Sequence, residues 1–129
     1  MKPYPLQGYR VINFGWVFAG PYIASMLGDL GAEVIKVERY KLGAIERHYY
    51  LELERNGVRQ SSYSTFLNRG KKSLCIDIKT EEGRNIILNL AKKADVLLEN
   101  LSPGAMSELG LGYEDVKRVN PKIIYCSRC

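Results

Sequence analysis

The feature that most constrains the fold is a strand–helix–strand pattern close to the amino terminus. Residues 10–14, "RVINF", are apolar and partly β-branched, which predicts a strand. A helix is predicted to start at Gly20-Pro21, because a proline in the first turn lacks only an N–H that the helix leaves unpaired. Gly31 fits a helix C-cap, and residues 33–38, "EVIKVE", form a second strand. Because the connection from the helix to the second strand is short, we predict a right-handed parallel βαβ unit.

The segment between these two strands leaves its function open. Ile23, Met26, Leu27 and Leu30 recur at i, i+3, i+4 and i+7, and we expect this single apolar face to pack against the sheet. The loop before the helix, "GWVFAGP", lacks the G-x-G-x-x-G pattern of dinucleotide-binding folds. The unit therefore either binds a nucleotide-like ligand by another route or serves only as scaffold. Trp16 in this loop is expected to line the core or a pocket.

The second half of the chain alternates regularly between strands and helices. Thr80 is an expected helix N-cap, followed by acidic residues in the first turn and lysines at the far end, as the helix dipole favours. The buried face of that helix is predicted to contain Ile86, Ile87, Leu90 and Ala94. The other predicted elements are strands over 72–78, 95–100 and 122–127, a short helix from Ser102-Pro103 to Gly110, and a helix over 113–119 that Asn120-Pro121 ends. This order predicts a Rossmann-like, doubly wound, mostly parallel α/β sheet in one domain, residues 1–129.

Residues 39–70 are harder to assign than the rest. Asn56-Gly57 lies between two segments that fit short strands, which indicates a hairpin. The stretch "SSYSTFLNRG" fits equally well a short helix that begins at a serine cap, Ser61 or Ser62. We therefore expect an irregular excursion from the alternating pattern. Its tyrosines either cluster together or face a partner: Tyr49, Tyr50 and Tyr63.

Composition and charge restrict the class of protein. With 46% apolar and 26% charged residues over 129 positions, the chain fits one globular domain. No signal sequence and no apolar run long enough to span a bilayer are found, which predicts a cytoplasmic protein. A net charge of +5 favours anionic partners. Nucleic acid is one such partner, but no nucleic-acid-binding motif accompanies the charge, and a small phosphorylated ligand explains it equally well. A merely solvated surface is the third explanation, and charge alone does not decide among them.

Cysteine and histidine residues indicate neither a disulfide framework nor a metal site. There are only three cysteines, and so small and uneven a number does not indicate a disulfide framework. Cys126 and Cys129 form C-S-R-C at the end of the chain, which we interpret as two reduced thiols rather than a redox or metal pair. His48, the only histidine, has no acid or nucleophile at a known distance, so it receives no catalytic role.

The second strand ends in two residues that suit a nucleotide. Open α/β sheets bind ligands at the carboxyl ends of their strands. Glu38 stands where dinucleotide-binding enzymes place an acid on the ribose. Arg39 follows at once, and an arginine there suits a phosphate or the face of an adenine.

Seven motifs in order resemble a known family. They are AGP, LGAEVIKVE, NRGKKS, DIK, ADVLLEN, PGAM and LGLGYE, within a resemblance that covers residues 5–127. The chain resembles the amino-terminal part of the class III coenzyme A transferases, a family that includes formyl-CoA and carnitine-type CoA transferases and 2-methylacyl-CoA racemase. The resemblance implies a Rossmann-like domain that binds coenzyme A without a phosphate loop, and an interlocked homodimer. It implies acyl-CoA and carboxylic acid substrates, and we expect neither metal, nucleic acid nor membrane as a partner.

Transferred position by position, the resemblance implies a coenzyme A site built from four loops. The residues are Phe18 and Ala19 in the first loop, Arg39 after the second strand, Ile76 and Lys79 around the third, and Asn100 and Leu101 after the fourth. Three places depart from the family: Phe18 stands where some relatives carry glutamine or histidine, "NLSPG" stands where many carry N-F-[RK]-P-G, and Glu108 stands where some carry arginine.

The chemistry that the resemblance implies lies outside this segment. In the family a catalytic aspartate forms an anhydride and then a CoA thioester, which is covalent nucleophilic catalysis. No aspartate here matches that nucleophile, so we assign no catalytic residue and expect an amino-terminal fragment that is inactive alone. The leading hypothesis is a class III acyl-CoA transferase. The alternatives are 2-methylacyl-CoA racemisation within the same family and, from another class, a non-catalytic nucleotide-binding module.

Overall fold

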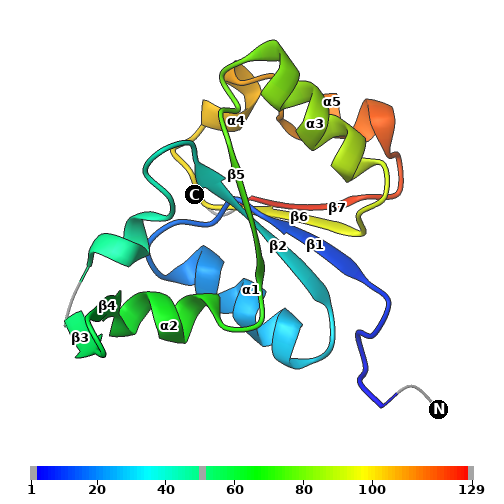
Figure 1. Cartoon of the computed structure of the whole chain (residues 1–129). Coiled ribbons are helices and arrows are strands. Elements are labelled where there is room, and N and C mark those ends of the chain that lie inside the picture. The colour runs from blue at the N-terminus through cyan, green and yellow to red at the C-terminus, as the bar shows by residue number, and fades with distance from the viewer. Residues whose placement is uncertain (1–2, 50–51, 128–129) are drawn as a thin grey trace.

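The fold is built on one parallel sheet, seen edge-on in Figure 1. The structure is a computed structural model that describes residues 3–49 and 52–127. Five strands pair in the order β5-β2-β1-β6-β7, and all four pairings are parallel. Their bounds are β1 Arg10–Asn13, β2 Glu33–Arg39, β5 Lys72–Ile76, β6 Val96–Glu99 and β7 Ile124–Ser127. The predicted mostly parallel α/β architecture is confirmed.

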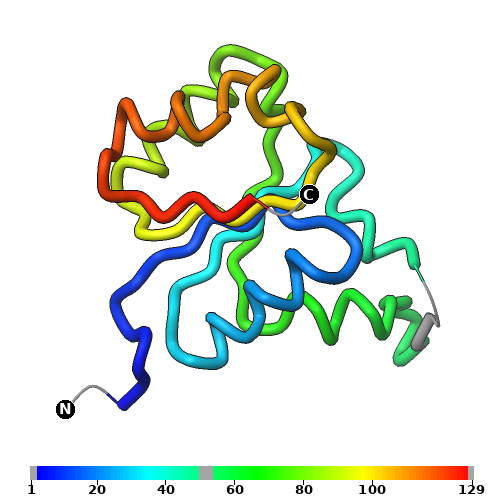
Figure 2. The backbone as a smooth tube through the Cα atoms, turned by 180° about the vertical axis from the view of Figure 1, so that it is seen from behind, coloured from blue at the N-terminus to red at the C-terminus, as the bar shows by residue number. Residues whose placement is uncertain are grey.

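Helices cover both faces of this sheet (Figure 1 and, from behind, Figure 2). One face carries α1 Ala19–Asp29 and α2 Ser62–Asn68, and the other carries α3 Glu81–Ala91, α4 Ala105–Glu108 and α5 Tyr113–Val119. The chain places β2 and β5 on one side of β1, and β6 and β7 on the other. The direction of winding therefore reverses at β1, and folds of this kind bind ligands beside that reversal.

Two apolar cores lie on opposite faces because side chains alternate along each strand. Along β1, Val11 belongs to the core beneath α1, and Ile12 belongs to the larger core beneath α3 and α5. Leu97 and Leu98 of β6 alternate in the same way. All four side chains are at most 1% exposed.

The irregular segment, residues 39–70, contains both of the structures that its sequence fits: a hairpin and a short helix. A short 3-10 helix, η1 Ile45–His48, precedes an antiparallel hairpin of β3 Glu52–Arg55 and β4 Val58–Ser61. Asn56 and Gly57 at its tip have φ of 53° and 75°, the left-handed pair that an Asn-Gly hairpin turn requires. The Ser61 hydroxyl then accepts a hydrogen bond from the Ser64 amide and caps α2. Hairpin and helix thus follow one another.

The predicted apolar face of α1 is wrong at three of its four positions, and only Leu27 packs against the core. Ile23, Met26 and Leu30 are 36%, 49% and 45% exposed, whereas small residues such as Gly20 and Ala24 are buried. Small residues bring the helix axis close to the strands, so the buried face needs little apolar bulk. The other three apolar residues of the predicted face are left exposed.

The predicted helix after Thr80 is confirmed with one correction. The Thr80 hydroxyl accepts a hydrogen bond from the Gly83 amide, as an N-cap does. Ile87 is fully buried, but Ile86 is 50% exposed, and Ala91 occupies the sheet-facing position instead. The packing again places a small residue against the sheet.

Candidate functional site

A cleft of about 700 Å³ opens at the carboxyl ends of four adjacent strands, β5, β2, β1 and β6. This is the edge at which open α/β sheets bind ligands. Five of the seven residues predicted to contact coenzyme A line the cleft: Arg39, Ile76, Lys79, Asn100 and Leu101. The folding of the chain brings these residues together from three separate loops.

Two cations flank the cleft, one at the end of β2 and one in the turn that follows β5. Arg39 ends β2 and is in register with Ile76, the last residue of β5. Lys79 follows Ile76 by three residues. The Arg39 guanidinium carbon lies 3.9 Å from the centroid of the Trp16 ring, a cation–π contact. Both Arg39 and Lys79 are exposed to solvent. The cleft therefore combines a flat aromatic surface with two accessible positive charges.

Asn100 fixes the first loop from across the sheet. Its side-chain Oδ1 accepts a hydrogen bond from the Trp16 amide at 2.6 Å, and its Nδ2 donates to the Trp16 carbonyl at 3.0 Å. Both polar atoms of the side chain are thus used to hold Trp16. Sequence reasoning placed Asn100 at the site, but it did not identify this positioning role.

Two further side chains, which sequence reasoning missed, hold the neighbouring Gly15 peptide groups. The Gly15 amide donates to Asn13 Oδ1 at 2.7 Å, and the Gly15 carbonyl accepts from Lys36 Nζ at 2.8 Å. Lys36 also donates to Glu46 Oε1 at 2.8 Å, and these two charged side chains are only 2% and 0% exposed. Burial lowers the pKa of Lys36, while Glu46 opposes that change. The one sequence signal was a lysine at an inward position of β2.

The loop that these side chains hold contains a strained residue. Val17 has φ of 63°, a left-handed conformation that a β-branched residue adopts only under constraint. The two residues before it have all four backbone hydrogen-bonding groups tied to Asn13, Lys36 and Asn100. Such over-determined strain is typical of functional loops. The loop is therefore shaped in advance rather than left to a ligand to order.

Phe18 and Ala19 do not line the cleft. Phe18 stacks on Tyr22 and Tyr63, with ring centroids 5.6 and 6.0 Å apart, and Tyr22 stacks in turn on Phe66 at 6.0 Å. Ala19 begins α1. The structure thus turns the Phe18 ring toward α2, beside the cleft rather than inside it.

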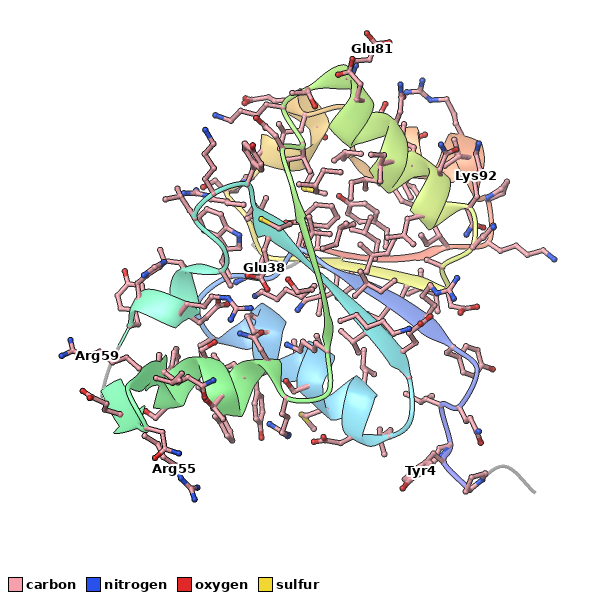
Figure 3. All side chains as sticks on the ribbon, viewed as in Figure 1. Tyr4, Glu38, Arg55, Arg59, Glu81 and Lys92 are labelled. Carbon is pink, nitrogen blue, oxygen red and sulfur yellow. The ribbon has the colours of Figure 1, made fainter. Side chains whose placement is uncertain are left out.

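Glu38 is held by an arginine instead of being open to a ribose. Its carboxylate accepts from Arg47 Nε at 2.9 Å and Nη2 at 2.8 Å, and from the Ala44 amide at 2.7 Å. Figure 3 shows Glu38 between β2 and the segment that leads into η1. The Arg47 hydrogen bonds lower the pKa of Glu38 to about 2, although burial acts in the opposite direction.

The ion pair between Glu38 and Arg47 should make the free energy of unfolding depend on pH in the acidic range. The folded pKa of Glu38 lies below its usual 4.5, so its contribution is present above pH 4.5 and is lost as the pH falls toward 2. The lost stability amounts to at most about 3 kcal/mol. Urea unfolding from pH 7 to pH 3 should show Glu38→Gln less stable at pH 7, with the difference narrowing below pH 4.5. A difference that stays constant with pH would contradict this account.

The part of the chain described here shows no group of three His, Cys, Asp or Glu that could hold a metal ion. His48 is exposed, and its Nε2 lies 3.1 Å from the Leu42 carbonyl oxygen. Cys75 and Cys126 are free and exposed, whereas Cys129 lies outside the described residues. Among the described helices, none is long and apolar enough to cross a membrane.

Comparison with known proteins decides the family. Residues 6–128 match the family described as CoA-transferase family III. The chain belongs to this family. The succinyl-CoA:glutarate CoA-transferase of Mus musculus is 46% identical over 123 residues, which are 95% of this chain and 28% of that protein. The formyl-CoA:oxalate CoA-transferase of Escherichia coli O6:H1 is 37% identical over 123 residues, 95% of this chain and 29% of that protein.

Solved structures of similar sequence share the fold. A CAIB/BAIF family protein from Brucella suis superposes with a TM-score of 0.88 at 41% identity, covering 96% of this chain and 33% of that chain. Rv3272 from Mycobacterium tuberculosis gives a TM-score of 0.88 at 42% identity, covering 96% and 34%. The present chain thus spans roughly a third or less of the length of these family III relatives.

Proposed function

We propose that this chain supplies the coenzyme A-binding part of a family III transferase that moves CoA between carboxylic acids through an aspartyl intermediate. The observation that carries the proposal is the cleft at the strand ends, where Arg39 lies over Trp16 and Lys79 lines the cleft from the turn after the adjacent strand, β5. An aromatic and guanidinium surface suits an adenine, and the two cations suit its phosphates. The backbone of the first loop, which Asn100 holds, would run alongside the pantetheine arm of CoA.

The names of the relatives support a substrate class. Succinyl-CoA:glutarate and formyl-CoA:oxalate CoA-transferases both act on short dicarboxylic acids by name. We therefore propose a short dicarboxylic acid as the acceptor. The aspartate nucleophile, the homodimer and a cytoplasmic location stay predictions.

Binding of CoA can be followed through Trp16, because it is the only tryptophan in the chain. Titration of the purified protein with CoA should change its tryptophan fluorescence, and NAD should have no comparable effect. Arg39→Gln should weaken CoA binding about tenfold or more, since it removes a charge-assisted contact. The matched control is Arg118→Gln, because Arg118 is exposed on α5 and pairs with Asp115 away from the cleft.

Each outcome of this titration bears on the proposal. The cleft would not be the site if the Arg39→Gln variant bound CoA as tightly as the wild type. The same conclusion would follow if Arg118→Gln lowered the CoA affinity as much as Arg39→Gln does. Binding of NAD in preference to CoA would favour the non-catalytic nucleotide-binding module instead.

A further inference from the structure

A groove lies at the amino ends of the strands, on the edge of the sheet opposite to the coenzyme A cleft. Val11, Val96 and Ile124 line it from the first residues of β1, β6 and β7, together with residues of α1 and of the segment after α3. Its volume is about 590 Å³, and none of its described lining residues is shared with the cleft. Figure 3 shows Lys92, another lining residue, at the end of α3 remote from Glu81. We call this site the amino-edge groove.

Main-chain groups around the amino-edge groove are hydrogen-bonded within the protein. The Asp95 amide donates to the Arg10 carbonyl at 2.9 Å. Asn120 Nδ2 donates to the carbonyls of Ala91 and Ala94 at 2.9 and 2.8 Å, so carbonyl groups at the end of α3 already have a partner. Seven of the thirteen described lining residues are alanine, valine, leucine or isoleucine. The groove therefore offers a ligand a mainly apolar surface of side chains.

Positive charge surrounds this apolar surface. Three of the lining residues are exposed lysines: Lys92, Lys93 and Lys122. Lys92 Nζ donates to a neutral side-chain amide at 2.8 Å, and within the described ranges none of the three lysines forms an ion pair. Asp95 also lines the groove, and one of its carboxylate oxygens accepts a backbone amide at 2.7 Å. The described lining residues thus carry a net positive charge, which favours an anionic ligand.

We infer that the amino-edge groove binds an aliphatic carboxylate, whose tail lies on the apolar lining and whose carboxylate lies among the lysines. A mainly apolar site of this volume with a few charged groups is typical of small-molecule sites. Ile124 is 64% exposed, so covering it with an aliphatic tail removes apolar surface from water. Lysine ammonium groups are point charges on flexible stems, and they can follow a carboxylate without the fixed geometry of an arginine. The groove is separate from the cleft, and the inference does not depend on CoA binding there.

The chain offers matched control variants for both parts of the site. Ile124→Thr shortens an exposed apolar side chain in the groove, and Ile86→Thr makes the same change at a 50% exposed residue of α3 that does not line it. Lys122→Gln removes a charge from the groove, and Lys117→Gln removes one from the exposed surface of α5. Each pair therefore changes the same chemistry inside and outside the groove.

Calorimetric titration with octanoate at constant ionic strength tests the inference. Octanoate should bind, whereas acetate, which lacks the tail, should not bind at the same concentration, and 1-octanol, which lacks the charge, should bind more weakly. Ile124→Thr and Lys122→Gln should each weaken octanoate binding about threefold or more. Ile86→Thr, Lys117→Gln and Arg39→Gln should leave it unchanged.

Several results would overturn the inference. They are absence of octanoate binding, acetate or 1-octanol binding as tight as that of octanoate, and losses with Ile86→Thr and Lys117→Gln as large as those with the groove variants. Loss with Arg39→Gln alone would place octanoate in the coenzyme A cleft and would equally contradict a site at the amino edge.

Discussion

Glu46→Gln should lower the free energy of unfolding by about 3–5 kcal/mol, because it leaves the Lys36 ammonium buried without a counter-ion. Both side chains are almost inaccessible to solvent, and their atoms lie 2.8 Å apart. Lys36 also donates to the Gly15 carbonyl, so its displacement would release the loop before Val17. The variant should therefore also bind CoA more weakly. Chemical unfolding and CoA titration of the same preparation measure both effects.

Two controls distinguish the effect of breaking the buried Lys36–Glu46 pair from the effect of removing a carboxylate charge anywhere in the protein. Glu54→Gln removes a carboxylate from an exposed pair and should change stability by no more than about 1 kcal/mol. The double variant Lys36→Met/Glu46→Leu removes both buried charges and should recover much of the stability, but not the hydrogen bond to Gly15. A Glu46→Gln variant as stable as the wild type would show that Lys36 is neutral or reaches solvent in the folded protein.

Gly20→Ala should be the second severe change, because the first loop and α1 touch at this residue. A Cβ atom at position 20 would lie 2.6 Å from both Asn100 Oδ1 and the Gly15 Cα. Real Cβ atoms do not approach so closely, so either the backbone or Asn100 has to move. Movement of Asn100 would break its two hydrogen bonds to Trp16. We expect a loss of about 2–4 kcal/mol together with weakened CoA binding.

Gly28→Ala in the same helix provides a control of opposite sign. A Cβ atom at position 28 would meet only Val34 Cγ2 at 3.5 Å, an ordinary contact. Alanine is favoured over glycine inside a helix by up to about 1 kcal/mol. Thermal unfolding should therefore rank Gly28→Ala above the wild type and Gly20→Ala well below it. Equal effects of the two variants would contradict the close approach of Gly20 to Asn100.

Local signals in the sequence predicted the elements of this fold well. The Asn56-Gly57 turn, the Thr80 cap and the alternation of strands and helices depend on residues that are adjacent in the chain. Lys79 was assigned to the site by the family resemblance, whereas the rule that parallel sheets bind ligands at the carboxyl ends of their strands predicted a cleft beside Arg39. These features follow from backbone geometry.

What the sequence could not predict depends on packing between distant segments. The outer face of α1 is apolar, and only the three-dimensional structure shows that its small residues face the sheet. Lys36 looks like a solvated lysine until η1 brings Glu46 to it. Phe18 belongs to the first loop in sequence, yet its ring turns toward Tyr63 of α2. Each outcome depends on a partner that local periodicity does not identify.

The hydrogen bonds between Asn100 and Trp16 also affect when the site can form during folding. They join residues 84 apart in sequence, whereas β1, α1 and β2 are contiguous and their contacts are local. Long-range contacts form late, because the entropy of closing a long loop must first be overcome. During synthesis from the amino terminus, β1 can pair with β2 before β6 has been made. The arrangement of the candidate site is therefore completed only with the whole sheet and not in the early strand–helix–strand unit.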